Sequence, residues 1–370
     1  MNDLTEDNTI PRQNKDSART GLSFSWSDGF PEWFRSQAFS LAFTACRTNR
    51  LFLLGSKPNG RLSLFDRRFE RPLGLHVDGE GRLFMATRDQ IWRLDNILGP
   101  GPGDCDRLYV PRRCWTTGHL NTHDLALDAN GQLLFVNTLF SCLSGLSHTH
   151  SFQPVWKPPF ISALLPEDRC HLNGMAMDCG IPRYVTLRNQ SDAPHGWRED
   201  QAKGGCLMDV RTGKPILTDL CVPHSPRIHG NQLWLLNSGT GELGVVDIRR
   251  QRFIPVCSFP GYLRGLAFFN HIAVVGVSKA RDGCDFDGLP LGASLNAHAG
   301  EAICALCFVD ITSGRIQHSL RFHGAVSELY DVQVLPGVSC PMALGFQSDE
   351  IQTRVTIDPV GARLARKECA

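Results

Sequence analysis

A short strand-like segment recurs seven times along this chain, and this recurrence constrains the fold more than any other feature. Each copy starts with one or two residues that are mostly small or polar and continues with apolar ones: FSLAF, LGLHV, HDLAL, NGMAM, HSPRI, RGLAF and YDVQV. The copies begin at residues 39, 73, 123, 173, 224, 264 and 330. HSPRI fits the pattern most loosely. After most copies a turn leads into a second apolar strand, and a third strand often ends in Asp, as in NQLWLLNSGTGELGVVD.

Units of about 40–50 residues with about four short strands each are typical of a β-propeller. One four-stranded sheet cannot cover its own faces, whereas sheets stacked radially bury both faces and expose only short edges. The sequence therefore predicts an all-β fold, with a single propeller domain over residues 21–370. Seven segments favour seven blades. Six blades is the alternative left open, because the first unit is short and could complete the last blade.

The segments outside the repeat also allow structural predictions. Residues 1–20 are polar and predict a disordered tail, and 30–39 (FPEWFRSQAF) predict one short helix. We expect strands from the two ends of the chain to close the ring, with 23–28 (SFSWSD) beside 355–360 (VTIDPV). The Gly-rich stretch 281–300 should form a loop on one rim.

Composition excludes several classes of protein. The chain has 38 Lys and Arg against 37 Asp and Glu, so it lacks the basic excess of a nucleic-acid binder. It has no apolar run long enough to cross a membrane and no apolar secretory signal at its start. Without such a signal, its 14 Cys predict reduced thiols in a cytoplasmic protein.

The first candidates for a functional site are the polar residues where the innermost strands begin. In a propeller these strands line the central channel, and their starts open on one rim, where ligands usually bind. The residues at these starts are Arg71, His123, Asp124, His171, Asn173, His224, Arg227, Arg264, Tyr330 and Asp331. A ring would bring these sequence-distant groups together.

Three histidines at successive strand starts, His123, His171 and His224, could hold one divalent metal ion. Neutral imidazoles suit zinc, manganese or iron, and Asp124, Asp331 or Asn173 could add an oxygen ligand. The competing interpretation is that these imidazoles bond backbone carbonyls, or one another, around a wet channel. Spacing alone does not decide between the two.

Several cations near the same rim indicate an anionic partner. Arg227 and Arg264 begin adjacent inner strands, Arg169 lies just before His171, and Lys279 follows a second strand. Arginine forks bind carboxylate or phosphate through two parallel hydrogen bonds. The competing interpretation is that each arginine pairs with Asp124, Asp168, Glu328 or Asp331.

Several phrases resemble a mainly bacterial family known as domain-of-unknown-function family 4915. They include RPLGLHVD, HDLALDANGQLLFVNTLFSCL, EDRCHLNGMAM, PHSPRIHGNQLWLLNSGTGELGVVD, PGYLRGLAF and LYDVQVLPG, and the resemblance covers about residues 22–358. It implies a β-propeller-like protein, in some relatives joined to or encoded beside tetratricopeptide-repeat proteins, and it implies no activity. The polar positions of the family's motifs fall here on Thr117, His123, Asn137, Arg169, His171, Asn173, His224, Arg227, Arg264, Lys279 and Asp331.

The leading hypothesis for function is a cytoplasmic binding module with a small anionic or peptide ligand at the channel. We expect its ligand site to include His123, Asp124, Arg169, Asn173, Arg227, Arg264, Lys279, Tyr330 and Asp331. The alternative is a metal-dependent hydrolase or lyase, with a metal on the three histidines that activates water. A third hypothesis, by fold analogy, is a scaffold whose outer faces bind a helical-repeat protein. No nucleic acid and no membrane is expected as a partner.

Overall fold

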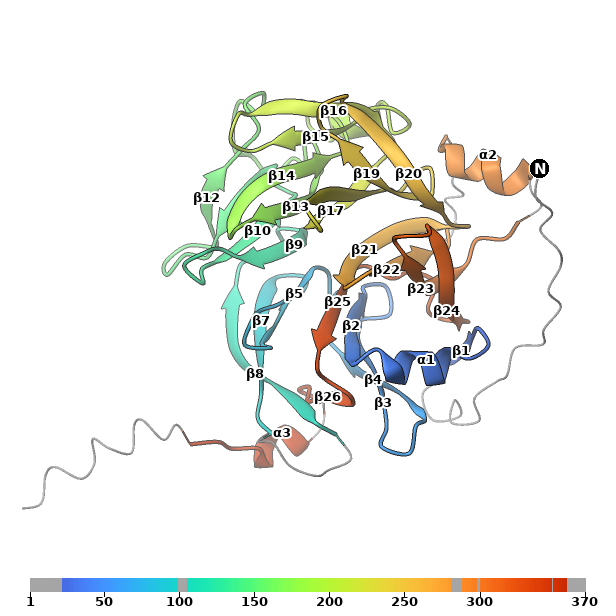
Figure 1. The fold of residues 1–370 in the computed structure, drawn as a ribbon. Coiled ribbons are helices and arrows are strands. Elements are labelled where there is room, and N and C mark those ends of the chain that lie inside the picture. The colour runs from blue at the N-terminus through green and yellow to red at the C-terminus, as the bar shows by residue number, and fades with distance from the viewer. Residues whose placement is uncertain (1–21, 99–104, 281–287, 298–299, 348, 358–370) are drawn as a thin grey trace, which may run out of the picture.

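The computed structural model describes residues 22–98, 105–280, 288–297, 300–347 and 349–357. In this part of the chain, six sheets stand around a common centre, and Figure 1 shows their innermost strands facing that centre. The protein is therefore an all-β, six-bladed propeller. The predicted tail, residues 1–20, lies outside the described residues.

We number the blades from the one that closes the ring and give the strands of each from the centre outwards. Blade 1 consists of β25 (Val332–Pro336), β2 (Phe39–Ala45), β3 (Arg50–Ser56) and β4 (Leu62–Arg68). Blade 2 consists of β5 (Leu75–Val77), β6 (Leu83–Ala86), β7 (Gln90–Asn96), β8 (Arg107–Thr116) and the added β26 (Pro341–Ala343). Blade 3 consists of β9 (Thr122–Leu127), β10 (Leu133–Asn137), β11 (Cys142–Gly145) and β12 (Gln153–Trp156).

The second half of the ring repeats this order. Blade 4 consists of β13 (Leu172–Asp178), β14 (Ile181–Leu187), β15 (Gly205–Asp209) and β16 (Lys214–Leu220). Blade 5 consists of β17 (Pro223–His229), β18 (Gln232–Asn237), β19 (Glu242–Asp247) and β20 (Arg252–Ser258). Blade 6 consists of β21 (Tyr262–Phe269), β22 (Ile272–Ser278), β23 (Cys304–Asp310), β24 (Arg315–His323) and the added β1 (Ser23–Trp26).

The preference for seven blades was wrong, and the alternative of six is confirmed. Six of the seven repeat segments contribute innermost strands, but FSLAF forms β2, the second strand of blade 1. The innermost place in that blade belongs to β25, which comes from the far end of the chain and pairs with β2. Both places are buried, so the apolar pattern of FSLAF did not distinguish a first strand from a second.

Strands from both ends of the chain close the ring as expected, but through other partners. The C-terminal β25 and the N-terminal β2 make the closing pair. The segment 23–28 contributes β1, which pairs with β24 at the outer edge of blade 6. Residues 355–357 form no strand, and 358–360 lie outside the described residues.

The apolar core is divided among the interfaces between blades. Each of the six interfaces has its own cluster of buried side chains among the described residues. The cluster between blades 6 and 1 is rich in aromatic residues, among them Phe43, Phe52 and Phe322. Radial stacking of sheets thus leaves the innermost strands free to present polar residues to the channel.

The second position of the six innermost repeat segments alternates between glycine and a hydrogen-bonding residue around the ring. In blade order it reads Asp331, Gly74, Asp124, Gly174, Ser225 and Gly265. Each Asp or Ser accepts a backbone N–H from the next blade: Leu75 to Asp331 at 2.7 Å, Met175 to Asp124 at 3.0 Å and Gly265 to Ser225 at 3.2 Å. Each glycine instead allows a close backbone approach. Two kinds of blade interface therefore alternate, which is consistent with an even number of blades.

The described residues also form four short helices outside the blades. The helix α1 (Phe30–Ser36) confirms the expected helix and buries Phe30 and Phe34 against blade 6. The predicted rim loop 281–300 contains a helix, α2 (Pro290–Ala297), while 281–287 and 298–299 lie outside the described residues. The 3₁₀ helix η2 (Gly196–Arg198) and α3 (Glu350–Thr353) complete the set.

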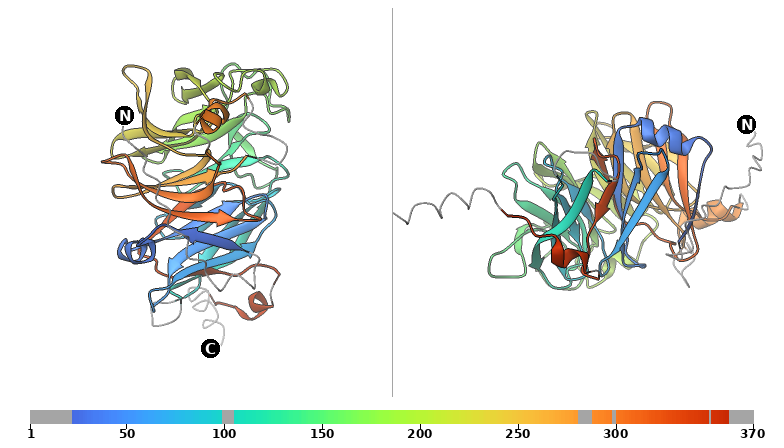
Figure 2. Two further views of the ribbon diagram at one scale, coloured as in Figure 1. Left: turned by 90° about the vertical axis from the view of Figure 1, so that its right-hand side faces the viewer. Right: turned by 90° about the horizontal axis from the view of Figure 1, so that it is seen from below.

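The two longer helices mark the two rims of the propeller. Figure 2 shows α1 and α2 at opposite faces of the molecule. Leu291 in α2 is buried beside Cys221, Val222 and Tyr262, so α2 covers the rim at which the innermost strands begin. Across the described ranges, no helix has the length and apolar character needed to span a membrane.

Candidate functional site

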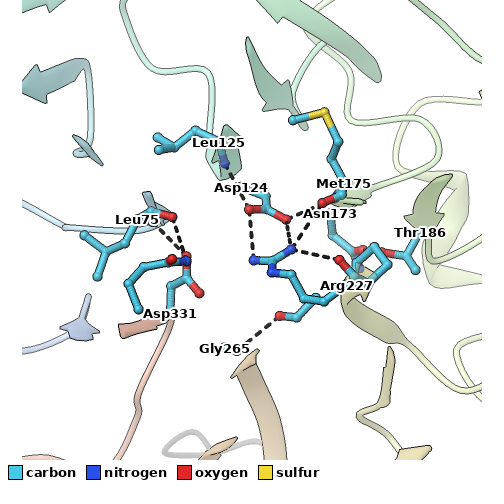
Figure 3. Close-up of polar contacts among 12 residues, drawn as sticks. Leu75, Asp124, Leu125, Asn173, Met175, Thr186, Arg227, Gly265 and Asp331 are labelled. Carbon is cyan, nitrogen blue, oxygen red and sulfur yellow. Dashed lines mark hydrogen bonds and ion pairs between the residues drawn. The ribbon is translucent and has the colours of Figure 1, made fainter. Parts of the chain in front are cut away.

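The channel contains two layers of polar residues, and the deeper one is an ion-pair layer. Figure 3 shows it: Arg227 from blade 5 reaches across the channel to Asp124 of blade 3. Its Nη1 and Nη2 donate to the two carboxylate oxygens at 2.8 and 3.2 Å. Backbone N–H groups of Leu125 and Met175 donate to the same carboxylate, each at 3.0 Å. Asp124 is therefore fully hydrogen-bonded.

Asp331 completes the ion-pair layer from blade 1. It accepts the backbone N–H groups of Leu75 and Val332 at 2.7 and 2.8 Å. Burial raises the pKa of Asp331, although the positive charge of Arg227 opposes the shift. Arg227 thus bonds to Asp124 and acts on Asp331 only through the electrostatic interaction of their charges. The bonds from Arg227 and Met175 to Asp124 and from Leu75 to Asp331 join different blades, which makes the layer a structural closure of the channel.

The outer layer is a closed loop of aromatic rings, imidazoles and guanidinium groups at the channel mouth. We call it the rim ring. Its seven members are His123, His171, Trp197, Arg188, Tyr262, Arg264 and Tyr330. His123 and Tyr330 directly precede Asp124 and Asp331 of the ion-pair layer, so the two layers are adjacent along the channel.

One half of the rim ring is built from aromatic and imidazole contacts between blades 1, 3 and 4. The rings of His123 and Tyr330 lie edge to face with their centroids 5.4 Å apart, and those of His123 and His171 lie 5.0 Å apart. His171 lies 4.5 Å from Trp197, which η2 supplies. The Arg188 guanidinium stacks on Trp197 at 4.6 Å. These contacts fix the relative positions of side chains from three blades and one loop.

The other half is built around Arg264 of blade 6. Its guanidinium lies between two phenol rings, 5.0 Å from the centroid of Tyr262 and 5.2 Å from that of Tyr330. It also forms a buried ion pair with Glu328. Arg188 donates to the Tyr262 hydroxyl at 3.3 Å, which closes the loop. Guanidinium groups stack favourably on aromatic faces, so this arrangement holds both cations in place.

His171 is oriented by a buried carboxylate. Its Nδ1 lies 2.8 and 3.0 Å from the two oxygens of Asp168, and the indole N–H of Trp197 donates to Asp168 at 3.0 Å. Burial raises the pKa of Asp168 to about 7, against the effect of the Trp197 hydrogen bond and nearby cations. The carboxyl group is therefore divided between its charged and neutral forms at neutral pH.

The other two histidines are neutral at physiological pH. Burial lowers the pKa of His123 well below its usual value, and His171, His224 and Arg264 lower it further. Burial likewise lowers the pKa of His224, followed by the positive charges of Arg264 and Arg188. A charged imidazole would have to share a site of low polarity with two guanidinium groups.

The backbone is strained where the innermost strands of blades 4 and 5 begin. Asp168, His171, Val222 and Ser225 all have left-handed φ angles, between 45° and 49°. Such a conformation costs about 1–3 kcal/mol per non-glycine residue and gathers at functional sites. At Val222 it accompanies a hydrogen bond from His224 Nδ1 to the Val222 carbonyl, at 3.0 Å. The strain thus coincides with the positioning of His171 and His224.

A small cavity lies between the two layers. It has about 10 Å³ of space for the centre of a water-sized group, and we call it the axial cavity. Its lining residues are His123, Asp124, Asn173, His224, Ser225, Arg227, Arg264, Tyr330 and Asp331. Four buried polar atoms of this lining have no hydrogen-bond partner in the part of the chain that the structure describes. These atoms are His123 Nδ1, Asn173 Nδ2, His224 Nε2 and Arg264 Nε.

The structure brings together most, but not all, of the residues expected at the site. Seven of the nine expected ligand residues line the axial cavity: His123, Asp124, Asn173, Arg227, Arg264, Tyr330 and Asp331. Arg169 instead pairs with Glu167 and Asp192, and Lys279 is exposed, so neither lines this cavity. Arg71 is also exposed. The expected carboxylate partners of Arg227 and Arg264 are confirmed as Asp124 and Glu328.

Three members of the rim ring were missed. Arg188 lies just after β14, Trp197 lies in η2, and Tyr262 starts β21 two residues before Arg264. A search confined to polar residues at innermost strand starts could not find the first two. Tyr262 could have been found, because it stands at the same strand start as Arg264.

The three-histidine metal hypothesis finds limited support in the geometry. His171 and His224 each have Nδ1 bonded to an acceptor, as metal-binding histidines often do. Within the described ranges, however, no group of three or more His, Cys, Asp or Glu side chains is arranged to hold a metal ion. Arg188 and Arg264 also place positive charge beside His224. The metal site stays a prediction, and the charge distribution does not favour it.

Comparison with known structures supports the fold alone. The propeller is similar to a chain from a nidogen/laminin complex, with 12% identity, a TM-score of 0.51 and coverage of 80% of this chain and 98% of that one. It is also similar to a protein of unknown function from Bacteroides caccae, with 9% identity, a TM-score of 0.45 and coverage of 80% and 99%. A streptogramin B lyase structure gives 13% identity, a TM-score of 0.40 and coverage of 77% and 76%.

No curated protein matches the sequence. A family described as "Domain of unknown function (DUF4915)" matches residues 28–344, which include every strand of the six blades except β1. This agrees with the resemblance carried by the repeat segments and their polar positions. The chain belongs to the DUF4915 family.

Proposed function

We propose that this protein is a binding module whose ligand is a small anion held at the channel mouth by the rim ring. The observation that carries the proposal is the pair of guanidinium groups, Arg188 of blade 4 and Arg264 of blade 6, fixed in one ring around the mouth. Arginine suits this role because its rigid fork matches the geometry of a carboxylate or phosphate.

The charge balance of the rim ring supports an anion. Glu328 balances the charge of Arg264, and the raised pKa of Asp168 removes part of its negative charge at neutral pH. His123 and His224 are neutral. The mouth therefore carries net positive charge without protonated histidines. A hydrogen bond between a charged arginine and a bound anion would contribute about 1.5–3 kcal/mol.

The test is a thermal-stability screen with acetate, lactate, malonate and inorganic phosphate on the full chain. A ligand that binds only the folded state stabilises it by about 2.7 kcal/mol at one hundred times its Kd. We expect at least one carboxylate to raise Tm, and we expect Arg188→Gln to abolish the shift. Arg188 is half-buried, so this variant should still fold.

Arg198→Gln is the matched control. Arg198 stacks on the same indole, 5.2 Å from the Trp197 centroid, but it is exposed and outside the rim ring. It should keep the ligand-induced shift. An equal loss in both variants, or an unchanged shift in Arg188→Gln, would contradict binding at the rim ring.

Larger ligands and the metal alternative need separate probes. An N-acetylated tripeptide carries the same carboxylate, and binding by the tripeptide but not by acetate would identify a peptide ligand. Elemental analysis of protein purified without chelator tests the metal-dependent hydrolase or lyase. A stoichiometric metal that His224→Ala loses would favour that enzyme over the binding module.

A further inference from the structure

The axial cavity presents a mixture of donors and acceptors that a ligand must match. Asn173 and Arg264 supply the donors. Asn173 Oδ1 accepts a hydrogen bond from the Thr186 hydroxyl at 2.7 Å, and Asn173 Nδ2 has no partner among the described residues. Arg264 Nε carries a hydrogen and likewise has no partner there. His224 Nδ1 lies 3.0 Å from the Val222 carbonyl oxygen, which can only accept, and 3.4 Å from the Ser238 hydroxyl, so the shorter contact assigns the ring proton to Nδ1. Its Nε2 is then an acceptor.

These atoms are well enough buried to need a partner. The exposed fractions of Asn173, His224 and Arg264 are 3%, 4% and 7%. Nearly all buried polar groups in proteins are hydrogen-bonded, and an unmatched one is costly. His123 Nδ1 is a donor or an acceptor according to the tautomer of its ring. The four buried atoms together therefore require a group that both accepts and donates hydrogen bonds.

The size of the axial cavity limits which group of a ligand can occupy it. It leaves about 10 Å³ for the centre of a water-sized group, which suits a single water molecule or a single hydroxyl group. A carboxylate has three heavy atoms and accepts only, so it would oppose the lone pair of His224 Nε2. It would also face Asp124 and Asp331, which line the same cavity. The anionic group of a ligand therefore belongs outside, at the rim ring.

We propose that the ligand is a small hydroxy acid, with its hydroxyl in the axial cavity and its carboxylate at Arg188 and Arg264. This inference rests on the proposed function. The geometry is continuous, because His123, Arg264 and Tyr330 belong both to the rim ring and to the cavity lining. A water molecule makes the same hydrogen bonds as the hydroxyl, so the ligand replaces one satisfied group by another.

The test compares three acids of one shape: L-lactate, propionate and L-alanine, measured by isothermal titration calorimetry on the full chain. They differ in carrying a hydroxyl, a hydrogen or an ammonium group at one carbon. Sites built to bond a hydroxyl reject the analogue that lacks it, so lactate should bind at least about tenfold more tightly than propionate. L-Alanine should bind more weakly than lactate, because its ammonium group cannot accept from Asn173 and Arg264.

Asn173→Asp sharpens the comparison, because it replaces the Nδ2 donor by an acceptor of the same size. It should remove the preference for lactate over L-alanine. Asn189→Asp, which adds the same charge at a half-buried position outside the cavity lining, should keep it. Circular dichroism and Tm check that both variants fold.

The outcomes separate this inference from the proposed function. Equal binding of lactate and propionate overturns the hydroxyl assignment and leaves the anion site intact, and tighter binding of alanine overturns it in favour of an amino acid. No binding of any acid overturns both. Nitrogen-15 NMR gives a test without ligand: His224 should carry its proton on Nδ1 at pH 7.5, and a proton on Nε2 would overturn the assignment of acceptor and donors.

Discussion

The ion-pair layer and the rim ring use the same kinds of side chain at adjacent depths of one channel, yet they differ in how completely those side chains are paired. In the ion-pair layer, Asp124 receives two backbone N–H groups and both terminal nitrogens of Arg227. Between that layer and the mouth, His224 Nε2 and Arg264 Nε are buried without a partner among the described residues. Full pairing indicates a structural role, and incomplete pairing indicates a place for a ligand.

The largest expected effect is on the structural side of this comparison. Arg227→Met should lower the free energy of unfolding by about 3–5 kcal/mol, because it leaves the buried Asp124 carboxylate without its charge partner. Urea denaturation measures the loss. The double variant Arg227→Met with Asp124→Asn should recover part of it, and a double variant as unstable as the single one would contradict the assignment.

The next largest effect on stability is expected at the alternating blade interfaces. A Cβ at Gly174 would lie 2.5 Å from Pro226 Cδ in the neighbouring blade. Gly174→Ala should therefore cost about 1–3 kcal/mol, the usual range for overpacking. Gly79→Ala is the control, because nothing lies within 4 Å of its Cβ. Similar stability of the two variants would show that the close approach is not needed.

The neutral histidines predict a loss of stability in acid. In the unfolded chain His224 takes up a proton near the ordinary histidine pKa of 6.5, whereas in the folded protein burial keeps it neutral. The unfolded state then binds more protons, so the contribution of His224 to stability is present above pH 6.5 and is lost as pH falls below that value.

The comparison of wild type with His224→Gln isolates this contribution from the opposite effect of Asp168. The unfolding free energies of wild type and His224→Gln, measured between pH 5 and 8, should become more similar as the pH falls. Parallel curves would mean that His224 titrates alike in both states, and the neutral imidazole assigned to the folded protein would be wrong.

The smallest expected effects on stability are at the rim ring itself. Arg188→Gln loses its stacking on Trp197, which is worth about 0.5–1 kcal/mol at an accessible site. Its unfolding free energy should fall by no more than that, while anion binding is lost. A loss as large as that of Arg227→Met would place Arg188 in the structural layer and remove the distinction between the two.

The innermost strands and their polar starts were predictable because repetition places them. His123, Asp124, Arg264 and Asp331 stand at equivalent places in their segments, and a closed ring brings equivalent places together. Arg188 and Trp197 stand at no repeated place: Arg188 follows the second strand of blade 4, and the packing of η2 beside it brings Trp197 to the mouth. Spacing carries no information on such contacts.

The alternation at the second position of the repeat segments also indicates the number of blades. The second positions of the repeat segments read Ser40, Gly74, Asp124, Gly174, Ser225, Gly265 and Asp331. Seven places put Ser40 next to Asp331 and break the alternation with glycine, whereas six places without Ser40 preserve it. Which carboxylate pairs with which arginine, and how small the axial cavity is, depend on side-chain packing and could not be derived in this way.

The most direct test of the rim ring as a ligand site is a titration of histidine-labelled protein with L-lactate, followed by nitrogen-15 NMR. We expect the ring signals of His123, His171 and His224 to shift together and saturably. Those of His229 and His318, which lie outside the rim ring and the cavity lining, should stay in place. Shifts spread over all histidines, or confined to those outside the channel, would contradict this expectation.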